Sequence, residues 1–165
     1  HGRTPYLVAA HRGDIAAMEM LVQGGADPKA KDSRNYDAIT ILAVADRVEA
    51  MKAAIRLGGD PKAITSPYLG TALIAAAHLG HHEVVKALID AGAPLDHVNN
   101  LGWTALIESI VLGDGGSNHQ RCLRHLLDAG ANPNLGDKSG TSPLQLAQGT
   151  GYHAMVDMIR AKGGK

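Results

Sequence analysis

One pattern recurs along almost the whole chain of 165 residues and constrains its fold more than any other feature. A Thr, Ser or Asp, then Pro or Ala, then an apolar or aromatic residue begins a segment at Thr4, Asp37, Thr71, Thr104 and Ser142, so that successive copies start 33, 34, 33 and 38 residues apart. Repetition at a period of this size is typical of arrays built from small stacked units. We therefore expect five similar units in a row.

Each copy carries the signals for two helices, and the third copy shows them most clearly. Thr71 can cap a first, Ala-rich helix by accepting a hydrogen bond from a backbone N–H of its first turn. Gly80 interrupts that helix, and aliphatic pairs at helical spacing, beginning at Val84 and Leu88, give the second helix one apolar face. Gly92 follows where a left-handed residue can end a helix. Each copy thus predicts a helix, a turn and a second helix.

The third copy reads Gly-His-His-Glu-Val-Val over residues 80–85, and this run resembles the G-H-x-E-V-V segment of the ankyrin repeat. The likeness extends over the five copies and essentially the whole chain. It implies an all-α ankyrin-repeat solenoid of stacked helix-turn-helix units with projecting β-hairpin turns. We expect a single ankyrin-repeat domain over 1–165, with repeats at approximately 1–31, 32–65, 66–98, 99–136 and 137–165.

Several positions depart from the family's pattern. In the second copy Asp37 replaces the usual Thr and Asp46 the mid-repeat Gly. The loop at 113–116 looks more like bacterial members of the family than animal ones. The chain begins at His1 in mid-turn, so we expect a fragment from which an upstream repeat or cap is missing. Five extra residues near 114–118 are interpreted as a flexible Gly-rich loop between the helices of the fourth repeat, because loops tolerate added length.

The charge balance excludes some partners. Sixteen basic residues offset sixteen acidic ones, whereas a general nucleic-acid or anionic-membrane binder needs a cationic surplus. No apolar run is long enough to span a membrane, and the one Cys cannot form an internal disulfide. We expect a soluble protein with no nucleic-acid partner and no membrane insertion. The cytoplasm is favoured, and a periplasmic or secreted location stays open.

Candidate chemistry is sparse in this sequence. His78, His81 and His82 cluster, but Gly80 interrupts the predicted helix within the group, so a shared metal site is not indicated. His81 and His119 sit at a position where the family uses His structurally, and Cys122 replaces a Val and is expected to be a small buried hydrophobe. No G-x-S-x-G nucleophile motif occurs. We expect no enzyme activity, no catalytic residue, no metal and no cofactor.

The family's usual role implies a partner protein bound along the concave face, where hairpin tips meet the exposed ends of the first helices. Apolar and aromatic residues gather there in the second to fourth copies, and such residues lead among interaction hot spots. The predicted partner-binding residues are Arg12, Arg34, Tyr36, Tyr68, Leu69, His78, Leu79, Asn100, Trp103, Val111 and Leu112.

The sequence thus predicts a non-catalytic protein–protein interaction scaffold of unknown partner. We expect a monomer, with weak self-association possible through the exposed first repeat. Two alternatives stay open at this point. In the first, the chain is the targeting arm of a longer enzyme whose catalytic part is absent. In the second, it is a self-associating structural module.

Overall fold

The computed structural model describes residues 2–165, which form ten helices in five antiparallel pairs; His1, at the start of the expected first repeat, lies outside this range. The first helices of the pairs are α1 (Pro5–Arg12), α3 (Ala38–Val44), α5 (Ala72–Leu79), α7 (Ala105–Val111) and α9 (Pro143–Thr150). The second helices are α2 (Ile15–Gln23), α4 (Val48–Arg56), α6 (His82–Asp90), α8 (Ser117–Asp128) and α10 (His153–Ala161). Each expected repeat range contains one pair, and the all-α solenoid is confirmed.

The first helices begin where the sequence places their caps. Thr4, Asp37, Thr71, Thr104 and Ser142 each accept a hydrogen bond from the backbone N–H three residues later. These bonds satisfy one of the donors that a helix leaves unpaired in its first turn. Gly80, with φ +75°, ends α5 in the left-handed conformation that Gly adopts without steric strain.

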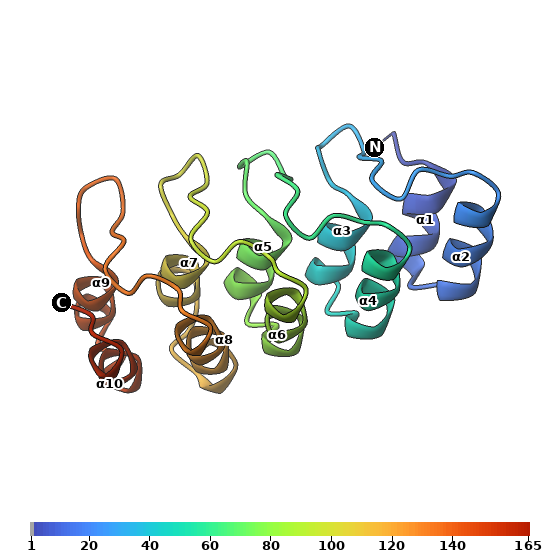
Figure 1. Cartoon of the computed structure of the whole chain (residues 1–165). Helices are drawn as coiled ribbons and strands as arrows, with labels where there is room; N and C mark the ends of the chain where they lie inside the picture. Colours follow the sequence, from blue (N-terminus) through green and yellow to red (C-terminus); the bar gives the residue numbers. More distant parts are fainter. Residues whose placement is uncertain (1) are drawn as a thin grey trace.

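The five pairs stack side by side, with the first helices in one layer and the second helices in another (Figure 1). Their contact surfaces are filled by Ala and aliphatic side chains, and Tyr6 is the one fully buried aromatic side chain among residues 2–165. Small Ala residues on the first helices, such as Ala76 and Ala77 of α5, let neighbouring helices approach closely. Each pair therefore buries its apolar surface against the next pair, as expected of a solenoid.

The connections between pairs form loops that project from one edge of the stack (Figure 1). They reverse direction as hairpins do, but only one β-bridge, Thr65 with Gly70, forms within the described chain. In three loops one backbone bond crosses the turn, from the first residue's N–H to the carbonyl four residues later, and a side-chain oxygen adds two more bonds. Oδ1 of Asp32, of Asn99 and of Asp137 each accepts two backbone N–H groups, two and four residues further on. The projecting turns are therefore mostly side-chain-capped turns.

Neighbouring turns are also joined to each other. The Ser66 N–H donates to the Asn35 carbonyl, and the Asn100 N–H donates to the Tyr68 carbonyl, both at 2.9 Å. Lys138 Nζ donates to the Asn100 carbonyl at 2.6 Å. The second to fifth turns thus form a connected row, which holds the side chains at their tips in a constant register.

The expected structural roles of His81 and His119 are confirmed. His81 Nδ1–H donates to the Ala43 carbonyl and His119 Nε2–H to the His78 carbonyl, both at 2.9 Å. Tyr152 makes the corresponding bond from its hydroxyl to the Gly113 carbonyl at 3.2 Å. The second helices α6, α8 and α10 are thereby attached to the end of the preceding repeat's first helix.

The extra residues of the fourth repeat differ from the loop expected at 114–118. Ser117 and Asn118 belong to α8, which has 12 residues where the other second helices have nine. The remaining loop is held by Asp114, whose Oδ1 accepts the Gly116 N–H at 2.8 Å and lies 3.2 Å from His119 Nδ1. Part of the insertion therefore lengthens a helix, because polar side chains at its start can face solvent.

Candidate functional site

A half-open groove of about 380 Å³ lies on the first-helix side of the second to fourth repeats. Helices α3, α5 and α7 supply its floor, and the projecting turns supply its rim. Its lining residues are Tyr36, Val44, Ser66, Tyr68, Gly70, Thr71, Ile74, Ala75, His78, Leu79, Asn99, Leu101, Trp103, Glu108 and Leu112. Most of this lining is apolar, and no Lys or Arg belongs to it. We call this surface the central groove.

Six of the predicted partner-binding residues line the central groove: Tyr36, Tyr68, His78, Leu79, Trp103 and Leu112. Arg34 lines a neighbouring pocket instead, and Arg12, Leu69, Asn100 and Val111 line neither. All eleven keep some solvent exposure, and Tyr68 is exposed over 55% of its surface. The structure thus brings the aromatic residues of three successive turns into one groove.

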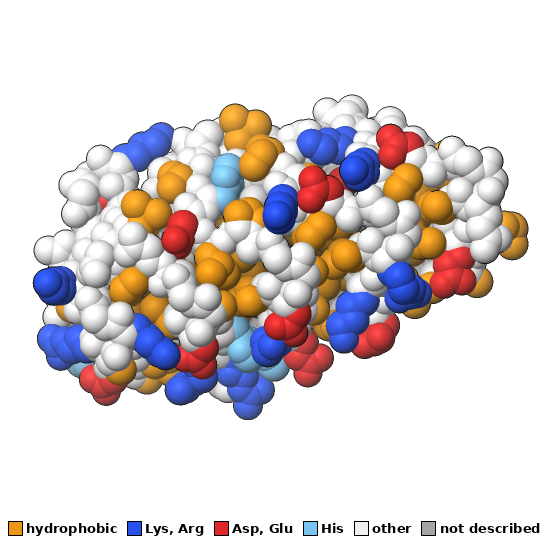
Figure 2. Space-filling view, in the orientation of Figure 1, with side chains coloured by type: hydrophobic (Ala, Val, Ile, Leu, Met, Phe, Trp, Pro, Cys, Tyr) orange, Lys and Arg blue, Asp and Glu red, His pale blue; other side chains and the backbone are white. Residues whose placement is uncertain are grey.

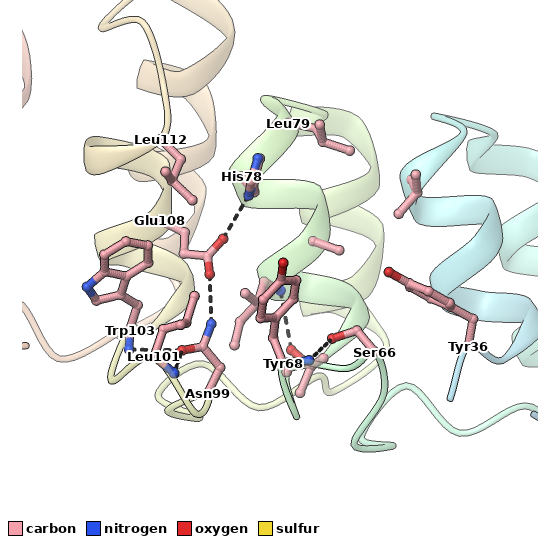
Figure 3. A pocket seen from close by; sticks show the side chains of 15 residues that line it. Tyr36, Ser66, Tyr68, His78, Leu79, Asn99, Leu101, Trp103, Glu108 and Leu112 are labelled. Atoms are coloured by element: carbon pink, nitrogen blue, oxygen red, sulfur yellow. Dashed lines mark hydrogen bonds and ion pairs between the residues drawn. The ribbon is translucent and has the colours of Figure 1, made fainter. Parts of the chain in front are cut away.

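The geometry of the groove follows from the caps beneath it. Asn99 Oδ1 accepts the N–H groups of Leu101 and Trp103, at 3.0 and 3.1 Å, which fixes the turn that carries both side chains. Tyr68 stands in front of α5, with Trp103 on one side and Tyr36 on the other (Figure 3). Leu79 and Leu112, at the ends of α5 and α7, close the opposite side.

Glu108 is one of the nine lining residues that the sequence did not predict, and the only carboxylate among the fifteen. It lies on α7, is only 4% exposed, and its two carboxylate oxygens have different partners. Asn99 Nδ2 donates to Oε1 at 2.7 Å, and His78 Nδ1 lies 3.1 Å from Oε2 (Figure 3). Burial raises the pKa of the Glu108 carboxyl, and His78 and Asn99 offset part of that effect. The sequence did contain one signal for Glu108: it is an acid at a repeat position that is apolar in the other four copies.

The end of the concave face near the first repeat is basic. A second pocket, of about 390 Å³, is lined by Arg3, His11, Arg34, Tyr36, Ile41, Val44 and Ala45. The Arg34 guanidinium lies 5.6 Å from the centre of the Tyr36 ring. Burial opposes ionisation of Asp32. Hydrogen bonds from the Tyr36 and Arg34 N–H groups, together with the ion pair to Arg3 at 3.5 Å, outweigh this effect and lower the pKa of the Asp32 carboxyl.

The residues considered for metal or thiol chemistry have other partners. His78 contacts Glu108, His81 contacts a carbonyl, and His82 stacks on His125 with ring centres 6.3 Å apart. Within residues 2–165 no three His, Cys, Asp or Glu side chains gather in a metal-binding arrangement. Cys122 is fully buried, as expected for a small hydrophobe. Burial, and to a smaller extent the charge of Asp46, raises the pKa of its thiol to about 12.

The second-helix side of the molecule has a different character. In Figure 2 acidic and basic side chains alternate along the lower edge, over the second helices, whereas hydrophobic side chains lie between that edge and the loops. Among the helices formed by residues 2–165, none has the length and apolar composition needed to cross a membrane.

Comparison with known proteins agrees with this architecture. The model of ankyrin repeats in three copies matches residues 39–137, and the ankyrin repeat model matches residues 1–33. The chain belongs to the ankyrin repeat family.

Several relatives match nearly the whole chain, and two of them are ankyrin repeat proteins by name. YahD of Escherichia coli (strain K12), named as an ankyrin repeat protein, is 31% identical over 98% of this chain and 81% of its own length. The crystal structure of an ankyrin repeat domain from Acinetobacter baumannii AYE has 44% sequence identity and a TM-score of 0.92 over 97% of this chain and 81% of that one. A third relative, the glycerophosphocholine phosphodiesterase gde1 of Schizosaccharomyces pombe, is 31% identical over 58% of this chain and 8% of its own length.

Proposed function

We propose that this chain is a non-catalytic scaffold that binds another protein through the central groove. The observation that carries the proposal is the gathering of Tyr36, Tyr68 and Trp103 with Leu79 and Leu112 in one half-open apolar groove. Apolar patches with polar rims mark interaction sites, and Trp and Tyr are the residues most often found at their energetic centres. Ankyrin repeats generally act in protein–protein interaction, which supports the same conclusion.

The test uses single substitutions in the groove and one outside it. Trp103→Ala and Tyr68→Ala should each weaken partner capture from a lysate of the source cells. Trp103→Ala should lose about 2 kcal/mol of binding free energy, or roughly 30-fold in affinity. Glu83→Ala changes an exposed residue of α6, on the second-helix side, and should leave capture unchanged. Equal capture by all three variants would remove the groove from the proposal.

The enzyme-arm alternative keeps one supporting observation, since gde1 is an enzyme with a region similar to this chain. In that arrangement the groove would still bind the partner, and catalysis would lie elsewhere in a longer polypeptide. The self-association alternative is separated by light scattering over a range of concentrations. A constant monomer mass favours the scaffold, and a mass that rises with concentration favours self-association.

A further inference from the structure

Glu108 breaks a pattern that the other four repeats keep. It lies four residues after the N-cap of its helix, where the other copies have Val8, Ile41, Ala75 and Leu146. A charged carboxyl at a 4% exposed position is unfavourable unless hydrogen bonds and opposite charge compensate it. The repeat fold does not require an acid here, because four copies form the same helix without one.

The compensation within the chain is incomplete. Asn99 supplies a neutral donor to one oxygen and His78 one ring nitrogen to the other, while each carboxylate oxygen can accept about two hydrogen bonds. No permanently charged cation lines the central groove. The Glu108 side chain is itself only 6% exposed, so a ligand group reaches its carboxylate from the groove by taking the place of the His78 ring, whose side chain is 44% exposed and lines the same groove.

The surroundings of Glu108 also suit a cation. Trp103 and Tyr68 line the same groove on either side of Glu108, and their ring faces can pack against a guanidinium or ammonium group and its aliphatic stem (Figure 3). The distribution of charge along the concave face also favours a cation at Glu108 over one near the first repeat. In the adjacent pocket the charge of Arg3 is offset by Asp32, 3.5 Å away, so Arg34 is the group there that would repel a second cation.

We propose that the central groove takes an extended segment of a partner protein whose arginine or lysine side chain enters between Tyr68 and Trp103 and donates a hydrogen bond to Glu108. Apolar residues beside that basic residue contact Leu79 and Leu112. This inference rests on the proposed function, because it names the chemistry of the groove's occupant. It assigns Glu108 the role of specificity determinant and the aromatic rings the larger share of contact area.

Random short peptides displayed on phage provide the probe. They are selected on the whole wild-type chain, and enriched peptides are then synthesised and titrated against wild type, Glu108→Gln and Trp103→Ala. The amide oxygen of Gln still accepts from Asn99, so Glu108→Gln keeps the local packing while removing the charge. Glu83→Gln makes the same chemical change at an exposed position on α6. Thermal unfolding confirms that each variant is folded.

The expected result is enrichment of Arg or Lys next to apolar residues among peptides that lose affinity in Trp103→Ala. These peptides should bind Glu108→Gln at least about 10-fold more weakly, and Glu83→Gln as tightly as wild type. Replacing their basic residue by Gln should reduce affinity for wild type and change little for Glu108→Gln.

Two other results would overturn the inference, and they differ in what they say of the proposed function. Peptides that depend on Trp103 but carry no basic residue and bind Glu108→Gln normally would leave the groove as a binding surface and remove Glu108 from it. Peptides that bind Trp103→Ala and Glu108→Gln as tightly as wild type would count against both proposals.

Discussion

Two leucines six residues apart in the fourth repeat should respond very differently to replacement by Ala. Leu106 of α7 is 1% exposed and packs in the core between neighbouring repeats, whereas Leu112, just past the end of α7, is 40% exposed in the central groove. If the groove is a surface kept free for a ligand, its apolar side chains contribute little to folding. Leu106→Ala and Leu112→Ala therefore separate core from binding surface with one chemical change.

The magnitudes follow from burial. Removing a buried Leu side chain down to Ala loses its transfer free energy and leaves a cavity, so Leu106→Ala should reduce the free energy of unfolding by about 3 kcal/mol. Leu112 is partly in water already and leaves no closed cavity, so Leu112→Ala should cost about 1 kcal/mol or less. For a chain of this size the melting temperature should fall by about 6–12 °C and about 2–4 °C, respectively.

Thermal and urea unfolding followed by the helical circular dichroism signal measure both losses. The single Trp of the chain, Trp103, gives a second probe from within the groove. Coincident transitions from the two probes would justify the two-state free energies. Leu112→Ala destabilising the chain as strongly as Leu106→Ala would refute the reasoning, because the groove residues would then be part of the core.

Three further predictions concern buried polar groups. The Cys122 thiol should not react with a disulfide reagent in the native chain at mildly alkaline pH and should react fully in urea; rapid native labelling would show that it is accessible. Burial raises the pKa of the Asp37 carboxyl despite the hydrogen bond from the Thr40 N–H, so this group's contribution to stability is lost as pH rises through that pKa. Asp37→Thr introduces the residue found at this position in three other copies. Its free energy of unfolding relative to wild type should increase as pH rises through the Asp37 pKa. A difference in urea midpoint between the two proteins that does not change with pH would contradict this. The Tyr6 hydroxyl is buried with no hydrogen-bond partner among residues 2–165. Tyr6→Phe should therefore leave the free energy of unfolding unchanged or raise it by up to about 1 kcal/mol, measured by urea unfolding, whereas a clear loss would reveal a partner.

The fold could be predicted from the sequence because its determinants are local and repeated. Thr71 caps a helix, Gly80 ends it and the spacing of Val84 and Leu88 gives the next helix its buried face. The cap recurs in all five copies, and the Gly in the first, third and fifth. The insertion was predicted less well. A Gly-rich run indicates a loop, but the sequence does not state that α8 extends back to Ser117.

The site could be predicted only in part, for a physical reason. Repeat register places Tyr68, Leu79 and Trp103 on the concave face, and the structure brings them together. Glu108 escaped notice because its significance depends on contacts across the sequence, to His78 of the preceding repeat and Asn99 of its own turn. Asn100 stays a predicted partner-binding residue: it is exposed at the tip of its turn, outside the groove lining, and its main chain bonds to both neighbouring turns. Side-chain partners of this kind follow from the stacking geometry, which periodicity does not specify.

Chemical-shift mapping by NMR tests the central claim most directly. The isotope-labelled chain is titrated with the partner, or with a groove-dependent peptide, and every backbone amide is followed. The account predicts shifts at Tyr36, Tyr68, Leu79 and Trp103, along α3, α5, α7 and their turns, with the second helices unaffected. Shifts confined to α2, α4, α6, α8 and α10 would contradict it, since the partner would then occupy the opposite layer of the stack.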